Sequence, residues 1–357
     1  MSSPHSDAKL TPRQRVYASI ARAGFDALPW QFDLTSVAAE RLAQYLGVEP
    51  AQVHEAIGDH LILFGDRSPV LISQEGCPAN CWRSELGTVW GKGPVDRNMG
   101  DWGGMVSHPL NGPSLDGYDF PDGTLPGRWS PVGELRRRHP DTFLVAIGHG
   151  LWEHAWALCG FEQYLEYTAG EEAFVEAVTE QLADFSCAAT AQLKGLDVDA
   201  IRFGDDWAFQ HHLMMGAETW RRLFKKQYRR IYAAARDAGL VVMIHSCGNI
   251  TEILPDLIEI GVQVVHPLQP EAMDVVQCQR EFGRDLCFWG GLGSQSTLPN
   301  GTPEECRREA RDRLKLFERG GYILAPAGAA PTETPPENLA AVVEAARAQS
   351  GAMTAKD

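Results

Sequence analysis

The fold is decided by residues 240–266, LVVMIHSCGNITEILPDLIEIGVQVVH. Two short apolar runs rich in β-branched residues, 240–245 and 262–266, enclose a helix-like segment at 249–260. A strand, a helix and a second strand in this order are typical of a βαβ unit, in which the two strands are parallel. The stretch therefore predicts an α/β protein with a parallel sheet.

The same alternation continues on both sides of this stretch. Further strands are expected at 27–34, 86–90, 143–148, 200–204, 286–290 and 322–325. Further helices are expected at 37–46, 51–58, 171–194, 217–238 and 302–319. Eight strand-like runs favour a closed (β/α)₈ TIM barrel. An open doubly wound sheet is the alternative, but no G-x-G-x-x-G loop follows an early strand.

The chain reads as a single domain, because no linker-like Ser/Gly/Pro tract divides it. We expect an N-terminal extension over 1–25, a barrel over 26–347 and a C-terminal tail over 348–357. The region between residues 66 and 135 is rich in Gly, Pro, Asp and Trp and has little periodicity, which predicts long irregular loops. Loops of this length inside a compact domain often form lids or substrate loops.

The amino-acid composition limits the kinds of partner that this chain can bind. The 357 residues include 32 basic and 47 acidic ones, a formal charge of -15, which disfavours nonspecific binding to nucleic acid or to an anionic membrane. No run of 18 apolar residues occurs, and the first fifteen residues have no apolar signal region. Eight scattered cysteines are typical of reduced thiols, so we expect a cytoplasmic protein.

In a TIM barrel the active site is expected at the C-terminal ends of the strands. This rule selects the polar residues that directly follow the expected strands: Asp33, Glu85, His149, Asp205, Asp206, His245, Cys247, His266, Gln269 and Ser294.

The sharpest local signal among them is the pair His245 and Cys247. Side chains two apart on an extended chain point the same way, and imidazole nitrogen and thiolate sulfur are favoured zinc ligands. The pair therefore suggests a metal site. The alternative is a buried histidine beside a small apolar cysteine.

Several longer motifs resemble the uroporphyrinogen decarboxylase superfamily. They are HSCGNITEILPDLIEIGVQVVHPLQPEAMD (245–274), FWGGLGSQSTLPNGTPEE (288–305), GGYILAP (320–326), TPPENLAA (334–341), YDFPDG (118–123) and RFGDDWAFQ (202–210). The resemblance is closer to the cobamide-dependent methyltransferases than to the haem-pathway decarboxylase, whose arginine-rich N-terminal substrate loop is not visible here. It covers roughly residues 80–345 and implies a single (β/α)₈ barrel, monomeric or homodimeric, that acts on a small-molecule substrate.

The methyltransferase branch implies zinc, which binds and deprotonates a thiol that exchanges a methyl group with a corrinoid. Its ligands match His245 and Cys247. The branch's third ligand is a cysteine on the loop after the last strand, where this chain has Gly328. His266 is the expected replacement, and Asp206 or Glu271 could instead add an oxygen.

Asp205 and Asp206 follow an expected strand directly. Paired carboxylates can share a proton, so both are candidate catalytic groups together with His245. The alternative is that one of them caps the following helix. Asp33, Glu85, Gln210 and Gln269 are the expected substrate-binding residues.

A basic stripe lies in the expected helix 217–238: Arg222, Lys225, Lys226, Arg229 and Arg230. It is either a solvated outer face or a docking face for a separate corrinoid protein. No D-x-H-x-x-G signature of a cobalamin-binding module occurs, so a corrinoid would be bound in trans.

The leading hypothesis is thus a corrinoid-dependent methyltransferase that acts on a small thiol, folate or methoxylated substrate. The second hypothesis is a metal-independent decarboxylase or other lyase of a small carboxylic acid, with Asp206 and His245 as acid and base; Gly328 speaks for it. The third is a non-catalytic binding protein on the same barrel. The retained polar residues at the strand ends speak against this third hypothesis.

Overall fold

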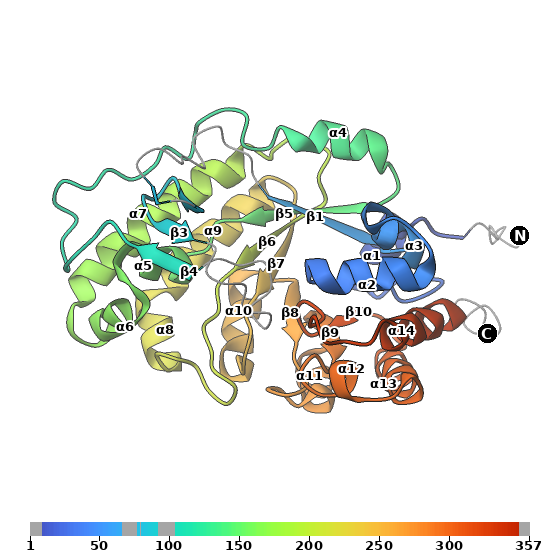
Figure 1. Cartoon of the computed structure of the whole chain (residues 1–357). Coiled ribbons are helices and arrows are strands. Elements are labelled where there is room, and N and C mark those ends of the chain that lie inside the picture. Colours follow the sequence, from blue (N-terminus) through green and yellow to red (C-terminus); the bar gives the residue numbers. More distant parts are fainter. Residues whose placement is uncertain (1–8, 66–76, 79, 92–103, 350–357) are drawn as a thin grey trace, which may run out of the picture.

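The computed structural model describes residues 9–65, 77–78, 80–91 and 104–349. A curled parallel sheet of seven strands lies at its centre, in the order β1-β5-β6-β7-β8-β9-β10, with helices on its outer side (Figure 1). The strands are β1 (Leu61–Gly65), β5 (Phe143–Gly148), β6 (Ala200–Gly204), β7 (Val241–His245), β8 (Val264–Leu268), β9 (Cys287–Leu292) and β10 (Tyr322–Pro326). A curved sheet of parallel strands whose outer side is covered by helices is typical of a TIM-like α/β barrel.

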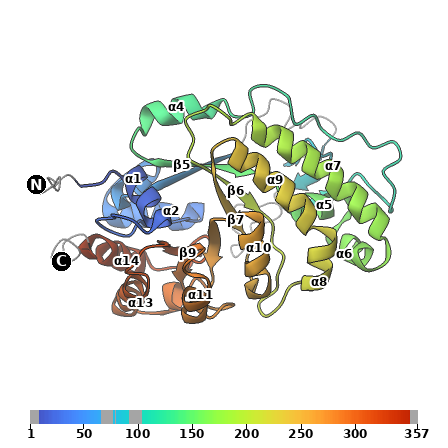
Figure 2. The same cartoon turned by 180° about the vertical axis from the view of Figure 1, so that it is seen from behind.

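The expected helices are present with small shifts. The helices are α1 (Pro12–Ala21), α2 (Ser36–Leu46), η1 (Pro50–Gln52), α3 (Val53–Ile57), α4 (Pro131–Arg138), α5 (Trp152–Cys159), α6 (Phe161–Gly170), α7 (Glu172–Ala191), α8 (Ala217–Leu223), α9 (Lys225–Asp237), η2 (Thr251–Ile253), α10 (Leu254–Ile260), α11 (Val275–Phe282), α12 (Thr297–Asn300), α13 (Pro303–Leu316) and α14 (Pro336–Ala348). Helices α7 and α9 run side by side along one outer face (Figure 2). In the described ranges, every helix is too short or too polar to cross a bilayer.

The expected strand at 27–34 forms only isolated parallel bridges, Trp30 to Leu324 and Leu34 to Ala330. Its backbone nevertheless lies between the two edge strands. Gln31 N–H donates to the carbonyl of Leu324 (3.0 Å), and His60 N–H, just before β1, donates to the carbonyl of Trp30 (3.0 Å). Pro29 has no N–H to donate, which limits the ladder that this segment can build.

The expected barrel strand at 86–90 is wrong. Of its residues only Val89 and Trp90 lie in a strand, β3 (Val89–Gly91), which pairs antiparallel with β2 (Cys81–Arg83) and β4 (Gly104–Ser107) in a separate small sheet; residues 86–88 belong to the connection between β2 and β3. The barrel strand between 27–34 and 143–148 is β1, which sequence analysis missed. The expected loop region 66–135 therefore contains this small sheet; its residues 66–76, 79 and 92–103 lie outside the described ranges.

Alternate strand residues fill the interior of the sheet. Phe143, Val145, Ala200 and Met243 pack there in one cluster that also includes Val16 of α1, close to the N-terminal strand ends. The outward residues pack against the helices in a second, larger cluster. The interior is therefore apolar near the N-terminal ends of the strands. The polar interior positions lie closer to the C-terminal ends of the strands.

His60 lies at the N-terminal end of β1 and is almost fully buried. Arg15 Nη1 approaches its Nε2 at 2.6 Å, and Trp30 packs edge-on against its ring. Burial, followed by the charge of Arg15, lowers the pKa of His60 to about 3, although Asp26 acts in the opposite direction. His60 is therefore neutral in the folded protein at neutral and mildly acidic pH.

This depressed pKa predicts a loss of stability in acid. Between pH 6.5 and 3 the unfolded chain binds a proton at His60 that the folded chain does not, so stability falls as pH falls. Through this group alone, the free energy of unfolding should be about 2 kcal/mol lower at pH 5 than at pH 7. Urea titrations of the wild type and of His60→Gln at both pH values measure this difference. Equal pH dependence in the two proteins would contradict it.

Candidate metal centre at the strand ends

The ends of β6 and β7 bring three candidate ligands together. One ligand atom each of Asp206, His245 and Cys247 lies within 4.8 Å of the other two. His245 Nε2 is 3.5 Å from Asp206 Oδ1 and 3.7 Å from Cys247 Sγ. Among the described residues these three form the only His/Cys/carboxylate cluster of this kind, and all three are partly exposed toward the strand-end funnel.

Backbone contacts hold the cluster in place. The N–H of Cys247 donates to Asp206 Oδ1 (2.8 Å), which links the loops after β6 and β7. Ser246 Oγ accepts from the N–H of Trp207 (3.0 Å) and ties the same two loops again. Gly248 has φ +85° and presses against the carbonyls of Ala208 and Phe209, so a Cβ would collide there. The turn that points Cys247 back toward Asp206 therefore needs this glycine.

The hydrogen bonds of His266 assign the tautomer of His245. Arg202 is only a donor, so its Nη1 donates to His266 Nδ1 at 3.4 Å. With that nitrogen an acceptor, the contact of 2.7 Å between the two Nδ1 atoms requires His245 Nδ1 to carry the proton. The lone pair of His245 then lies on Nε2, the atom that faces Asp206 and Cys247. Ligating histidines are commonly held in this way.

His266 itself lies behind the cluster, not in it. The side chain is buried, its ring packs 4.4 Å from the ring of Trp289, and its Nε2 has no hydrogen-bond partner among the described residues. Burial, and then the charge of Arg202, hold its pKa well below the usual histidine range, so it stays neutral. The structure thus places His266 behind His245, and brings Asp206 to the side of His245 that faces Cys247.

The two neighbouring aspartates have different environments. Asp205 is fully buried and accepts from the N–H groups of Leu151 and Glu153 and from the hydroxyl of Tyr228, each at 2.7 Å. Burial raises its pKa to about 7 despite these three donors. Asp206 instead faces the cluster. Asp205 therefore holds the loop after β5 in place, and Asp206 is the member of the pair that can meet a ligand.

Glu153 joins this site from α5, and sequence analysis did not select it. Burial, and then the charges of Asp205 and Asp206, raise its pKa to about 8, so it is largely protonated at neutral pH. The sequence GHG (148–150) contained a signal for this close approach. Gly150 packs so tightly against Gly204 and Asp205 that no side chain fits, which brings the start of α5 close to the end of β6.

The expected substrate-binding residues are dispersed. Glu85 is buried in a two-bond ion pair with Arg128 (3.0 and 2.7 Å). Gln269 Oε1 accepts from the N–H of Gly248 (2.9 Å), and Gln210 Nε2 donates to the carbonyl of Glu271 (2.6 Å). Asp33 is partly exposed; burial lowers the pKa of both His245 and Arg202, and the charge of Asp33 partly opposes this shift. Of these four, Asp33 acts most directly on the cluster.

Gly328 lies on the loop after β10, with φ +93° and no atom within 4 Å of the position of a Cβ. L-residues rarely adopt this backbone conformation. The loop is therefore built for glycine, and it does not supply a third ligand.

The donor set fits a zinc ion. A carboxylate oxygen, an imidazole nitrogen and a thiol sulfur are all zinc donors, and three protein ligands with a free fourth position are typical of catalytic zinc. Burial, and then the charge of Asp206, raise the pKa of the Cys247 thiol, while burial lowers the pKa of His245. A neutral imidazole is ready to bind, and the thiol would release its proton on binding metal.

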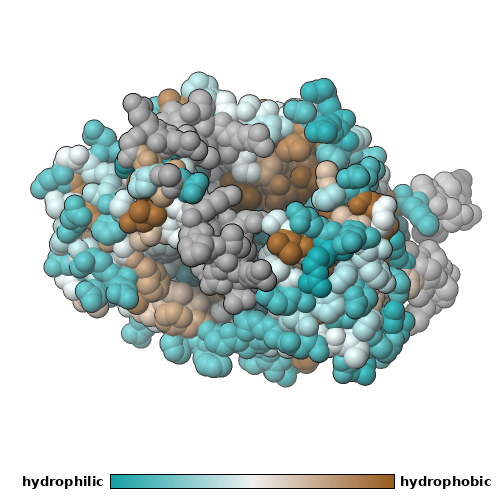
Figure 3. All heavy atoms as spheres, viewed as in Figure 1, coloured by the Kyte–Doolittle hydropathy of each residue, from teal (hydrophilic) through white to brown (hydrophobic). Residues whose placement is uncertain are grey.

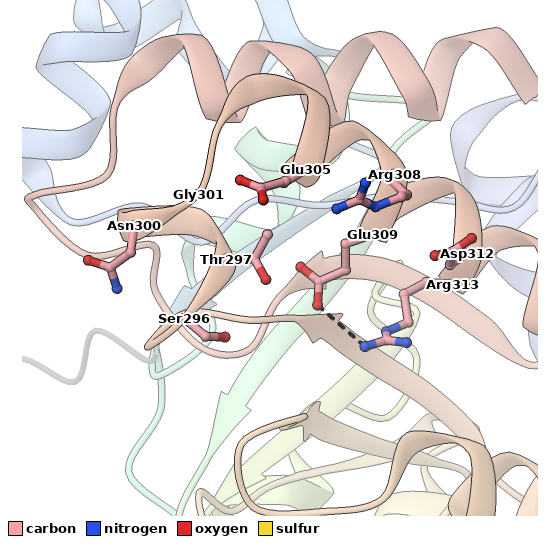
Figure 4. A pocket seen from close by; sticks show the side chains of 9 residues that line it. All are labelled: Ser296, Thr297, Asn300, Gly301, Glu305, Arg308, Glu309, Asp312 and Arg313. Atoms are coloured by element: carbon pink, nitrogen blue, oxygen red, sulfur yellow. Dashed lines mark hydrogen bonds and ion pairs between the residues drawn. The ribbon is translucent and has the colours of Figure 1, made fainter.

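A separate pocket of about 540 Å³ lies between α12 and α13 on the outer side of the barrel (Figure 4). Its lining is polar and charged, and Glu309 is bonded to Arg313 at 3.3 Å within it. It contains none of the residues of the cluster, and its internal ion pair neutralises both partners. It is not part of the site described above.

The basic stripe is largely neutralised by neighbouring acids. Arg222 pairs with Glu172, Arg230 pairs with Asp184, and Lys225 and Arg229 share Glu259. Such pairs are typical of a solvated outer helix face, the first of the two interpretations of this stripe.

Comparison with known proteins places this geometry in a family. The uroporphyrinogen decarboxylase (URO-D) family profile matches residues 119–349. A methylcobamide:CoM methyltransferase of Methanosarcina acetivorans is 25% identical over 343 residues, 94% of this chain and 98% of its own length. A methylated-thiol–coenzyme M methyltransferase of Methanosarcina mazei is 23% identical over 256 residues, 69% of this chain and 67% of its own length.

Among solved structures, a methyltransferase from Methanosarcina mazei superposes with a TM-score of 0.73 at 19% identity, over 95% of this chain and 99% of its own. At this low identity the superposition shows only that the two proteins share a fold. The family match covers well over half of the chain and includes the ends of β6, β7 and β8. The chain belongs to the uroporphyrinogen decarboxylase (URO-D) family.

Proposed function

We propose that this protein is a methyltransferase that moves a methyl group between a corrinoid, carried by a separate protein, and a small thiol. The observation that carries the proposal is the convergence of Asp206, His245 and Cys247, with the lone pair of His245 directed at the other two. The named activities of the two methanogen relatives support it. A metal-independent lyase or a simple binding protein would have no need of this donor set.

In this proposal His245, Cys247 and Asp206 hold zinc, and Asp206 replaces the ligand absent at Gly328. Zinc bound there lowers the pKa of a substrate thiol so that its thiolate persists at neutral pH. A methylated corrinoid supplies an electrophilic methyl group and keeps the electron pair of the cobalt–carbon bond when the thiolate sulfur takes that group.

The chain's own residues prepare this reaction. His266 and Arg202 fix the orientation of His245, and Asp205 fixes the start of α5. The proposal also takes the sheet as a complete (β/α)₈ barrel, with 27–34 in the position of the eighth strand.

The test is a thiol-dependent demethylation of methylcobalamin by zinc-loaded protein in the absence of oxygen. We expect a methyl thioether to form in equal amount to the demethylated cobalamin, as measured by mass spectrometry and absorbance. Asp206→Asn should lower the rate at least about 100-fold, because the ligand set loses one of its two negative charges. The matched control Asp116→Asn, at an exposed position, should be unchanged. Thioether formation that needs no zinc would contradict the proposal.

A further inference from the structure

The sequence contains two Asn-Gly dipeptides, Asn111-Gly112 and Asn300-Gly301. Asparagine before glycine is the dipeptide most prone to deamidation, because glycine has no side chain to keep its nitrogen away from the asparagine side chain. In a folded protein the reaction depends on the freedom of the side-chain amide and of the glycine N–H. The structure places the two dipeptides in opposite environments, so the chain contains both a reactive candidate and its internal control.

Asn111-Gly112 lies in the irregular segment between β4 and α4. In Figure 1 this segment runs as a long outer loop beyond the small sheet, and in Figure 3 the surface at that edge of the molecule is mostly hydrophilic. Asn111 is exposed. Within the described ranges, neither the side-chain amide of Asn111 nor the N–H of Gly112 forms a hydrogen bond. The two groups are therefore free to approach one another, and water can reach them.

Asn300-Gly301 is held by hydrogen bonds at both groups. Asn300 is the last residue of α12, and its side-chain amide donates to the carbonyl of Gln295 (3.3 Å). The N–H of Gly301 donates to the carbonyl of Thr297 (2.8 Å), so its nitrogen is engaged by the helix. Deamidation of Asn300 would have to break both bonds first, which protects this second dipeptide.

We infer that Asn111 is a site of spontaneous deamidation in the folded protein and that Asn300 is protected. In this reaction the nitrogen of Gly112 attacks Cγ of Asn111 and closes a succinimide ring. The side-chain amide leaves as ammonia and takes the proton of the Gly112 N–H. Water then opens the ring at one of its two carbonyl groups, which gives an aspartyl or an isoaspartyl residue. Either product carries a new negative charge.

The modification changes the chain directly beside a buried contact. Leu110 is buried, and its N–H donates to the carbonyl of Leu158 in the last turn of α5 (2.9 Å). An isoaspartyl residue lengthens the main chain by a methylene group immediately after Leu110. The modification therefore acts first on the contact between this outer loop and α5, the helix that carries Glu153 at the strand-end cluster.

The experiment follows both dipeptides while the folded protein is stored in mildly alkaline buffer. Tryptic peptides 98–128 and 285–307 contain Asn111 and Asn300. Mass spectrometry with electron-transfer fragmentation locates the modified residue and distinguishes isoaspartate from aspartate. We expect Asn111 to deamidate at least about tenfold faster than Asn300, because Asn300-Gly301 must first lose two hydrogen bonds. In guanidinium chloride, where unfolding removes these bonds, the two rates should become similar.

Gly112→Ala is the sharpest variant. No atom lies within 4 Å of the position of a Cβ at Gly112, and its φ is outside the left-handed region, so the fold should accept alanine. The added methyl group should slow ring closure by about an order of magnitude. The matched control Gly133→Ala, on α4 and with the same free space, should leave the rate at Asn111 unchanged.

Three results would overturn the inference. The first is equal rates at the two dipeptides in the folded wild type. The second is a folded protein in which Asn111 stays intact over a period that modifies it in guanidinium chloride. The third is a rate at Asn111 that Gly112→Ala leaves as fast as in the wild type.

Discussion

Replacing Cys247 or His245 by alanine is expected to lower the affinity for zinc by more than about 100-fold, since loss of a second-shell partner alone costs 10- to 100-fold. Each substitution removes one of the three candidate ligands that the described residues bring together in the cluster. Zinc competition against a chromogenic chelator measures the effect. The expected order of loss places His266→Ala below both ligand variants, because His266 orients His245 and does not itself face the cluster.

The matched control for Cys247→Ala is Cys187→Ala, which removes another partly buried cysteine on α7 and leaves the cluster intact. Its zinc affinity should equal that of the wild type. If Cys247→Ala bound zinc as tightly as the wild type, the metal centre would have to lie elsewhere. A loss in His266→Ala as large as in His245→Ala would instead make His266 a ligand, as the sequence analysis expected.

The second large effect is expected at the buried ion pair of Glu85 and Arg128. Arg128→Met should lower the free energy of unfolding by about 3–5 kcal/mol, because it leaves the Glu85 carboxylate buried without its partner. Arg128 also donates to the carbonyl of Asp122 and lies over the ring of Phe185, so it connects three segments at the barrel rim. Denaturant unfolding measures the loss.

The pair Arg222 and Glu172 is the control, because both side chains are about half exposed. Arg222→Met should cost at most about 1 kcal/mol. The double variant Glu85→Leu/Arg128→Met should recover much of the loss seen in Arg128→Met, since no buried charge remains. If Arg128→Met were as mild as Arg222→Met, Glu85 would be free to meet substrate and its assignment as a structural residue would be wrong.

The sequence predicted those elements whose signal is local. Strands β5 and β6 begin and end at the expected residues, and α7 and α13 differ from expectation by at most three residues at either end. These segments have strong periodicity and clear ends. In contrast, Leu61–Gly65 carries no alternation, because a strand covered on both faces reads as a short apolar run. Residues 86–90 looked equally strand-like, and only tertiary pairing assigns them to the small sheet.

The residues of the site also divide into those that a local sequence signal reveals and those that depend on long-range packing. His245 and Cys247 were found because they lie two residues apart where a strand ends, and period-two geometry there places their side chains together. Glu153 was missed, because its approach depends on the close contact of Gly150 with the end of β6, a long-range feature. Asp205 and Asp206 are adjacent in sequence, yet only packing determines that the first is enclosed by three donors while the second faces the cluster.

The central claim is that Asp206, His245 and Cys247 hold a metal ion that leaves one position for a substrate thiol. X-ray absorption at the zinc edge of the loaded protein, with and without 2-mercaptoethanol, tests this claim most directly. The account predicts one zinc per chain with a single sulfur neighbour, from Cys247, and a second sulfur neighbour when the thiol is added. Protein that takes up no zinc, or a sulfur count that the thiol leaves unchanged, would contradict it.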